Sequence, residues 1–326
     1  MRSVKGSSFR EGEVVILSPP SYGISKRGGA PMDMVNASGS SWYIPGPTNL
    51  GVHVRDGRAV LIDSGNDESA GRKILKAFEE KEWPLDLIVN THSNADHIGG
   101  NALIQKRTGC RIAATRAESA FIEEPWLEPA LLWGAAGFGA ITGKFLKAQP
   151  SRVTDIITSS GPVLDTGLEA VPLPGHFLDM VGLRTPDGVF FIADSLFPPA
   201  ILDKYGMAVC FDVAAQLKTL EYLGKAEATL FIPSHAEPSG EIGPLVKRNK
   251  DALEMVRDRV LKICAAPASR EDILADLAVF FDLSLNPAQY ILTHITVSAH
   301  LSYLADQGAI EPFFEKGRML WGQGLK

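Results

Sequence analysis

The sequence predicts an α/β fold followed by a smaller helical region, and three features of the chain indicate this. Short apolar runs alternate with amphipathic stretches over the first two thirds of the chain. Histidines and aspartates stand directly after several of these runs. Near Gly243 the alternation gives way to long stretches of helical periodicity. The 326 residues are enough for one large domain, or for one domain with an appendage.

Short strands are expected where apolar runs end at turn residues. A helix is expected over Ser69–Glu80, because Ile74, Leu75 and Phe78 follow helical spacing. The Thr-Pro-Asp-Gly segment at 185–188 predicts a hairpin, since Gly188 can supply the positive φ that such a turn needs. The expected strands are Val14–Leu17, Leu50–Val54, Ala59–Ile62, Leu87–Val89, Leu168–Leu173, Val181–Arg184, Val189–Ile192 and Thr229–Ile232.

The last quarter of the chain is expected to hold three helices and a hairpin. Helical patterns cover Gly243–Cys264, Glu271–Phe281 and Thr296–Gln307, and two short strands are expected around Glu315-Lys316-Gly317. This order is typical of a winged-helix module. We therefore place a domain boundary near residue 245, which divides the chain into residues 1–245 and 246–326.

Winged-helix modules often bind DNA, but the charge of this region disfavours that function. Residues 246–326 contain ten Lys plus Arg and ten Asp plus Glu, and Thr296–Gln307 contains no lysine or arginine. Duplex binding depends on neutralising phosphates, so a neutral module is poorly suited to it. The net charge of −6 for the whole chain likewise disfavours coating nucleic acid or an anionic membrane.

Cysteine usage and the apolar stretches predict a cytoplasmic protein without a membrane segment. Cys110, Cys210 and Cys264 are widely separated, which disfavours a disulfide framework. The first 13 residues lack the apolar core of a signal peptide. The longest apolar stretch, Ala130–Gly143, is too short to span a bilayer. We interpret it as a lid, a pocket wall or a subunit contact, and a subunit contact would make a second copy of the chain its partner in a homodimer.

A loop rich in potential ligands follows the predicted strand Leu87–Val89. It brings His92, Asn94, Asp96 and His97 together just before two glycines. A helix-capping aspartate would explain one carboxylate but not the two histidines. His176, Asp194 and His235 follow later strands, and the carboxyl ends of strands form one rim of a sheet. Imidazoles and carboxylates on one rim predict a site for Zn²⁺, Mn²⁺ or Fe²⁺.

Five ordered motifs resemble those of the metallo-β-lactamase superfamily. They are Asp63-Ser64-Gly65, Thr91-His-x-x-x-Asp-His-x-Gly-Gly, Pro174-Gly175-His176, Ala193-Asp194-Ser195 and Pro233-Ser234-His235. The resemblance covers residues from about 14 to 240 and implies an αββα metallo-β-lactamase sandwich with a metal site at one edge. The last quarter more weakly resembles the winged-helix appendage of some members.

The resemblance also implies a ligand set for one or two divalent ions, zinc first, with manganese or iron as the other options. The first position would use His92, Asn94 and His176, and the second Asp96, His97 and His235. Asp194 would bridge the two ions, and Asp63 would support the ligand loop through hydrogen bonds. The usual loop is His-x-His-x-Asp-His, so Asn94 replaces a histidine. An amide oxygen is a weaker metal ligand than an imidazole nitrogen, which predicts looser metal binding at the first position.

The resemblance implies a hydrolase that uses metal-activated water on a small ester, thioester or related acyl substrate. Asp96 and Asp194 would be its catalytic residues, and glyoxalase II-like thioesterases are the nearest analogy. A nuclease or phosphodiesterase on the same scaffold is an alternative. A catalytically weakened metal-binding or sensing protein is another, and Asn94 is the residue that keeps it open.

Overall fold

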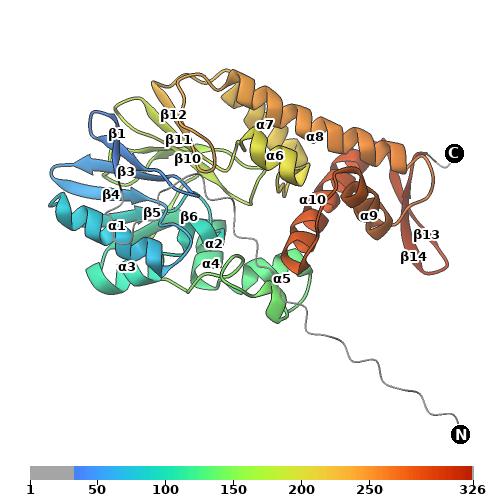
Figure 1. Cartoon of the computed structure of the whole chain (residues 1–326), viewed down its shortest axis with the longest axis horizontal. Helices are drawn as coiled ribbons and strands as arrows, with labels where there is room; N and C mark the ends of the chain where they lie inside the picture. Colours follow the sequence, from blue (N-terminus) through green and yellow to red (C-terminus); the bar gives the residue numbers. More distant parts are fainter. Residues whose placement is uncertain (1–32, 325–326) are drawn as a thin grey trace, which may run out of the picture. The chain divides into compact units, whose positions relative to one another are not determined.

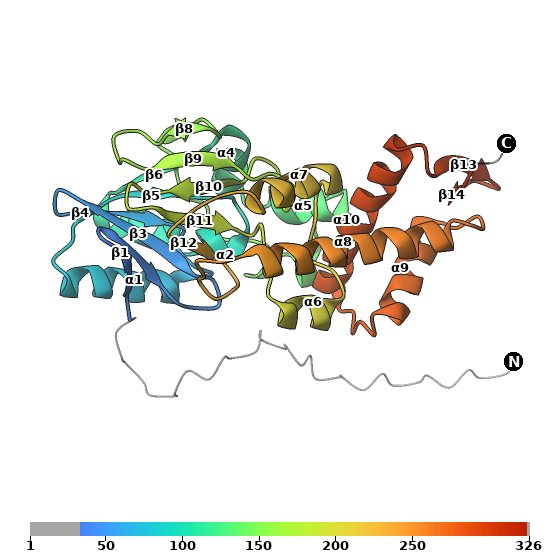
Figure 2. The same ribbon diagram turned by 90° about the horizontal axis from the view of Figure 1, so that it is seen from above.

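A computed structural model describes residues 33–324, in which two facing sheets lie between layers of helices (Figures 1 and 2). The predicted strand Val14–Leu17 lies outside the described residues. The first sheet holds, in spatial order, β1 (Val35–Ser38), β2 (Ser41–Ile44), β3 (Leu50–Arg55), β4 (Arg58–Ile62), β5 (Leu85–Val89), β6 (Arg111–Thr115) and β7 (Asp155–Ile157). The second holds β12 (Leu230–Pro233), β11 (Val189–Ala193), β10 (Val181–Arg184), β9 (Glu169–Pro172) and β8 (Gly161–Pro162).

Helices connect and cover these strands. They are α1 (Glu68–Glu80), α2 (Ala95–Ile98), α3 (Asn101–Thr108), α4 (Arg116–Glu123), α5 (Leu127–Trp133), the 3₁₀ helix η1 (Gly139–Ile141), α6 (Pro199–Tyr205), α7 (Val213–Leu223), α8 (Gly243–Ile263), α9 (Arg270–Phe280) and α10 (Pro287–Asp306). A separate hairpin of β13 (Glu311–Glu315) and β14 (Arg318–Gly322) follows α10.

The strand sequences explain the layering, because successive side chains point to opposite faces of a sheet. Val60 and Ile62 face the second sheet, where they pack with Val181, Leu183 and Phe191. The residue between them, Leu61, packs on the other face against side chains of α1. Since both faces of β4 are covered, its apolar residues form an uninterrupted run.

The outer face of the second sheet is covered in the same way. Phe190 and Ile192 of β11 pack with Val213 and Leu220 of α7 and with the start of α8. The order helix, sheet, sheet, helix confirms the αββα sandwich that the sequence motifs imply.

Most predicted elements occur close to their expected bounds. The 185–188 turn joins β10 and β11 as an antiparallel pair, and Gly188 has a φ of +82°. One helix start is wrong: the helix expected from Thr296 begins nine residues earlier, at Pro287. Asn286 caps it by accepting from the Gln289 amide, and Pro287 takes the first turn, where no amide donor is needed.

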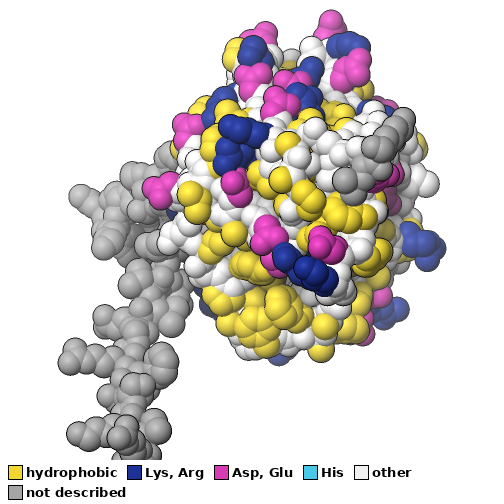
Figure 3. Space-filling view, turned by 90° about the vertical axis from the view of Figure 1, so that its right-hand side faces the viewer, with side chains coloured by type: hydrophobic (Ala, Val, Ile, Leu, Met, Phe, Trp, Pro, Cys, Tyr) yellow, Lys and Arg dark blue, Asp and Glu magenta, His cyan; other side chains and the backbone are white. Residues whose placement is uncertain are grey.

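The last quarter contains the expected three helices and hairpin. Helix α8 packs on α6 and α7 as well as on α9 and α10, and the predicted boundary at residue 245 lies in its first turn. The division into two domains and the winged-helix identity stay predictions. Figure 3 views the molecule from the side of these helices, and exposed hydrophobic side chains gather in several patches there.

The apolar stretch Ala130–Gly143 contacts this C-terminal region. Leu132 of α5 and Ile141 of η1 are buried against Ile291 of α10. Trp133 and Phe138 lie edge to face and remain 43% and 46% exposed. Among the residues that the structure describes, no helix has both the length and the apolarity to cross a membrane.

Buried His300 of α10 makes the stability of the fold depend on pH. Burial lowers its pKa to about 3 from 6.5, so the unfolded chain binds this proton first as the pH falls. The free energy of unfolding should therefore decrease below pH 6.5 by up to about 1.4 kcal/mol per pH unit. We expect His300→Leu to recover about 2 kcal/mol of the loss between pH 7.5 and pH 5, measured by urea unfolding. Equal pH dependence in the two proteins would contradict this.

Candidate metal centre

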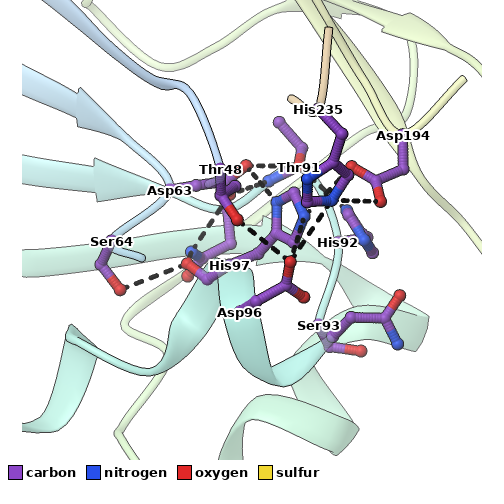
Figure 4. Close-up of polar contacts among 12 residues, drawn as sticks. Thr48, Asp63, Ser64, Thr91, His92, Ser93, Asp96, His97, Asp194 and His235 are labelled. Atoms are coloured by element: carbon purple, nitrogen blue, oxygen red, sulfur yellow. Dashed lines mark hydrogen bonds and ion pairs between the residues drawn. The ribbon is translucent and has the colours of Figure 1, made fainter. Parts of the chain in front are cut away.

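Loops at the ends of four strands bring the predicted ligands to one edge of the sandwich. The segment after β5 carries His92 to His97, and the loop after β9 carries His176. Asp194 follows β11 directly, and His235 stands two residues beyond β12. In Figure 4, Asp96, His97, Asp194 and His235 point toward a common centre. The structure therefore brings together all the residues that the motifs assign to the site.

The chain around the site is closely packed and includes strained backbone. A Cβ atom on Gly100 would lie 2.4 Å from the Ser64 carbonyl oxygen, so only glycine lets the ligand loop approach the end of β4. Asp63 and Ala193, neither of them glycine, have φ values of +59° and +48°. Such conformations cost free energy and are commonly found at functional sites.

Each of the four histidines has an acceptor for its Nδ1 atom on the side away from the centre. His97 Nδ1 donates to Asp63 Oδ2 at 2.8 Å. His176 donates to the Val209 carbonyl at 3.0 Å, and His235 to the Pro47 carbonyl at 2.7 Å. The Nδ1 atom of His92 lies 3.1 Å from Thr91 Oγ1, whose own hydroxyl donates to Asp63. With Nδ1 protonated, each ring presents an Nε2 lone pair inward when it is neutral.

The inward Nε2 atoms surround Asp194. Its Oδ1 lies 3.1 Å from His97 Nε2, and its Oδ2 lies 3.0 Å from His235 Nε2 and 3.6 Å from His176 Nε2. Asp96 Oδ2 lies 3.3 Å from His235 Nε2 and accepts from Thr48 Oγ1 at 3.0 Å. Two sets, His92 with His97 and Asp194, and Asp96 with His97 and His235, each place three ligand atoms within 4.8 Å of one another.

Unpartnered atoms at the centre test whether a metal fits. His92 Nε2, His97 Nε2 and Asp194 Oδ1 are buried, and among residues 33–324 none has a partner in hydrogen-bond geometry. Leaving buried polar atoms without partners costs free energy, and divalent ions bind such imidazole and carboxylate atoms. The residues present therefore fit one or two divalent ions.

The carboxylates favour positive charge at this centre. Burial opposes protonation of His235, but Asp194 and Asp96 outweigh it and raise its pKa to about 10. Burial also opposes protonation of His97, and the same two carboxylates again raise the pKa. For His92 and His176 burial is the stronger effect, and it lowers the pKa of both. A metal cation at the centre would compensate the charge of the same two carboxylates.

Asp63 supports the ligand loop through a set of buried hydrogen bonds. Besides His97, it accepts from the Thr91 amide at 2.8 Å and from the Thr91 hydroxyl at 2.7 Å. It does not face the centre itself. The sequence motifs assign Asp63 to such a supporting position, and its role there stays a prediction.

Two buried glutamates stabilise the ligand loop, and sequence reasoning missed both. Glu118 accepts from the Ser93 amide at 2.9 Å and from the Asp179 amide at 2.8 Å, and burial raises its pKa to about 7. Glu128 accepts from Asn94 Nδ2 at 2.8 Å, and burial raises its pKa as well. Thr48 was also missed. None of the three belongs to a motif, and only their buried positions in the fold identify them.

The other histidines and Cys210 lie outside the centre. His53 is buried in β3 near Ser41 and Asp187, and His294 stacks on Tyr290. Cys210 is buried, and burial raises the pKa of its thiol to about 12, which disfavours a nucleophilic role.

The sandwich and its edge of histidines and aspartates define a class of metal-binding protein. A model of the metallo-beta-lactamase superfamily matches residues 43–235, which is more than half of the chain. The chain belongs to this superfamily.

Curated relatives support the same placement. The hydroxyacylglutathione hydrolase of Nitrobacter winogradskyi is 29% identical over 153 residues, which are 46% of this chain and 48% of that protein. The enzyme of the same name from Rhodopseudomonas palustris (strain BisB18) is 32% identical with the same coverage. The chain thus spans about half the length of the curated relatives it matches.

Solved structures share the fold over more of the chain. A beta-lactamase domain protein from Burkholderia ambifaria has a TM-score of 0.73 at 18% identity, covering 91% of this chain and 96% of that one. A metallo-beta-lactamase family protein from Thermus thermophilus has a TM-score of 0.68 at 16% identity, covering 87% and 99%. At these identities the likeness concerns the fold alone.

Proposed function

We propose that the chain is a metal-dependent hydrolase that cleaves a thioester or related acyl compound. The observation that carries this proposal is the convergence of three Nε2 atoms, those of His97, His176 and His235, on Asp194. Three buried atoms at the centre also lack a hydrogen-bond partner among residues 33–324. The name of the curated relatives, hydroxyacylglutathione hydrolase, supports a thioester substrate. Because the chain spans only about half of those relatives, the substrate class is part of the proposal.

The first metal position would use His92, Asn94 and His176, and the second Asp96, His97 and His235, with Asp194 shared. Divalent ions in such a ligand set, zinc first and manganese or iron next, lower the pKa of water and polarise a carbonyl oxygen. Within the ligand set, the amide oxygen of Asn94 predicts weaker binding at the first position than at the second.

The chain's own residues prepare the site for this chemistry. The Nδ1 hydrogen bonds fix which nitrogen of each ring faces the centre. The Asp96 side chain is 34% exposed, whereas that of Asp194 is 5% exposed. Asp96 is therefore the carboxylate placed to contact an arriving water or substrate, and Thr48 holds it in position. Asp194 has the role of a buried shared ligand.

The rival functions are separated by two features. A nuclease or phosphodiesterase would need cationic groups for phosphate, and the net charge of −6 with a neutral C-terminal quarter disfavours it. A sensing protein with a weakened site would need no complete ligand set. The side chains of the six proposed ligands other than Asn94 lie close together, which supports catalysis over sensing.

Metal analysis coupled to two hydrolysis assays tests the proposal. The protein is purified without added metal, its Zn, Mn and Fe are quantified, and hydrolysis of a glutathione thioester and of bis(p-nitrophenyl) phosphate is followed. We expect one tightly held ion, a second at higher concentration, and thioester hydrolysis that a chelator abolishes. Phosphodiester hydrolysis alone would favour the nuclease, and neither metal nor turnover would favour the sensing protein. His53→Gln is the control for a buried histidine outside the site.

A further inference from the structure

Glu128 is a buried acid whose position the metal-binding motifs do not explain. It lies in α5 and is 4% exposed. Its hydrogen bond is to Asn94, whose Nδ2 donates to Oε1 at 2.8 Å. No lysine or arginine among residues 33–324 forms an ion pair with it. A buried carboxyl group with so little compensation is costly to keep, which suggests a function.

The opposite end of the Asn94 amide faces His176. Asn94 Oδ1 lies 3.0 Å from His176 Nε2. Because His176 Nδ1 donates to the Val209 carbonyl, the Nε2 of the neutral ring carries a lone pair. Two acceptor atoms thus face each other at hydrogen-bond distance, which is unfavourable by itself. Two acceptor atoms that bind the same cation lie next to each other in this way.

From these contacts we propose that Glu128 is a positioning residue, which holds the Asn94 amide with its oxygen toward the first metal position. The inference rests on the proposed metal-dependent function. A flipped amide would present its NH₂ group to the cation, and only an acceptor on the far side prevents the flip. In this chain, Asn94, which replaces the usual histidine, and the carboxyl group of Glu128 therefore act together.

The segment that carries Glu128 is anchored on both sides. Leu132 and Ile141 pack against Ile291 of α10, and Lys144 forms an ion pair with Asp67 at 3.3 Å. Helix α10 thereby supports α5, and α5 in turn supports Asn94. This chain of contacts assigns to the C-terminal helices a part in holding the first metal position.

The test compares metal affinity rather than activity. Metal-free protein is titrated with Zn²⁺ up to millimolar concentration against a chromophoric chelator, for wild type, Glu128→Leu, Glu128→Gln and the control Glu124→Gln. Glu124 lies in the same segment, and its carboxylate contacts the exposed Trp126 indole rather than Asn94. Thermal unfolding of each metal-free protein reports on folding, and Glu128→Met replaces Glu128→Leu if the latter does not fold.

We expect Glu128→Leu to raise the dissociation constant of the more weakly bound zinc ion, the looser equivalent, by about 10- to 100-fold. The dissociation constant of the tighter equivalent should stay unchanged. Glu128→Gln should lose less, because its amide oxygen can still accept from Asn94 Nδ2. In the double variant Glu128→Leu/Asn94→Asp, the looser equivalent should return. A carboxylate presents an oxygen on either side and needs no orientation.

Several results would overturn the inference. These are an unchanged looser equivalent in Glu128→Leu, an equal loss of both equivalents, or a double variant that is not rescued. A wild type that binds a single ion even at millimolar zinc would also refute it. Failure of the proposed function is recognised separately, because wild type would then bind no metal or bind it without hydrolysing a thioester.

Discussion

Asp194→Ala should lose both metal equivalents and lower kcat/KM for a thioester by at least about a thousandfold, since a catalytic metal contributes several kcal/mol. Asp194 is within 3.6 Å of three inward imidazoles, so both metal positions depend on it. It is also buried, and alanine offers no ligand atom in its place. Metal content after gel filtration and the rate of thioester hydrolysis measure the two losses together.

The control for this variant is Asp203→Ala. Asp203 lies in α6, where its exposed carboxylate pairs with Arg248 away from the centre. Its loss should leave metal content and hydrolysis unchanged. An Asp194→Ala protein that is active and fully metallated would remove the shared-ligand assignment, and with it the proposed arrangement of the site.

Seven strands of the two sheets could be predicted from the sequence because their residues alternate between two covered faces: β3, β4, β5, β9, β10, β11 and β12. The strands β1, β2, β6, β7 and β8 were not predicted. Val60, Leu61 and Ile62 form a continuous apolar run that can be recognised without a structure. The candidate ligands could be proposed from the sequence for a similar reason, since His92, His176 and His235 each follow a strand end, and their role as ligands stays a prediction. In both cases the signal is local in the sequence.

Unlike Asp63, the supporting residues Glu128 and Thr48 could not be predicted, because their signal is not local. Glu128 lies 34 residues after Asn94, inside a segment whose apolar composition indicates packing. Thr48 lies in the turn between β2 and β3, 48 residues before Asp96. Nothing in the spacing relates these pairs, and only the folded chain places them together. The start of α10 was missed for another reason: Asn286-Pro287 is a helix-start signal that the apolar periodicity alone does not contain.

Asp63→Asn should weaken metal binding by about 10- to 100-fold while preserving the shape of the side chain. Asp63 Oδ2 accepts from both His97 Nδ1 and the Thr91 hydroxyl, and its Oδ1 accepts from the Thr91 amide. An asparagine that keeps its oxygen on the Thr91 amide would turn its NH₂ group toward His97. The His97 ring would then have to accept through Nδ1, which moves its proton to Nε2.

A protonated Nε2 cannot bind a metal ion, so the expected loss comes from the wrong tautomer of His97 rather than from a lost ligand. Nitrogen NMR of histidine in the metal-free protein, at a pH high enough that the His97 ring is neutral, would detect the tautomer, and chelator competition would measure the affinity. Asp272→Asn is the matched control, because Asp272 accepts from the amide and the hydroxyl of Ser269 in the first turn of α9, away from the ligand loop. Unchanged affinity together with an Nε2-protonated His97 would show that this nitrogen is not a ligand. Unchanged affinity with Nδ1 still protonated would show instead that Asp63 does not select the tautomer.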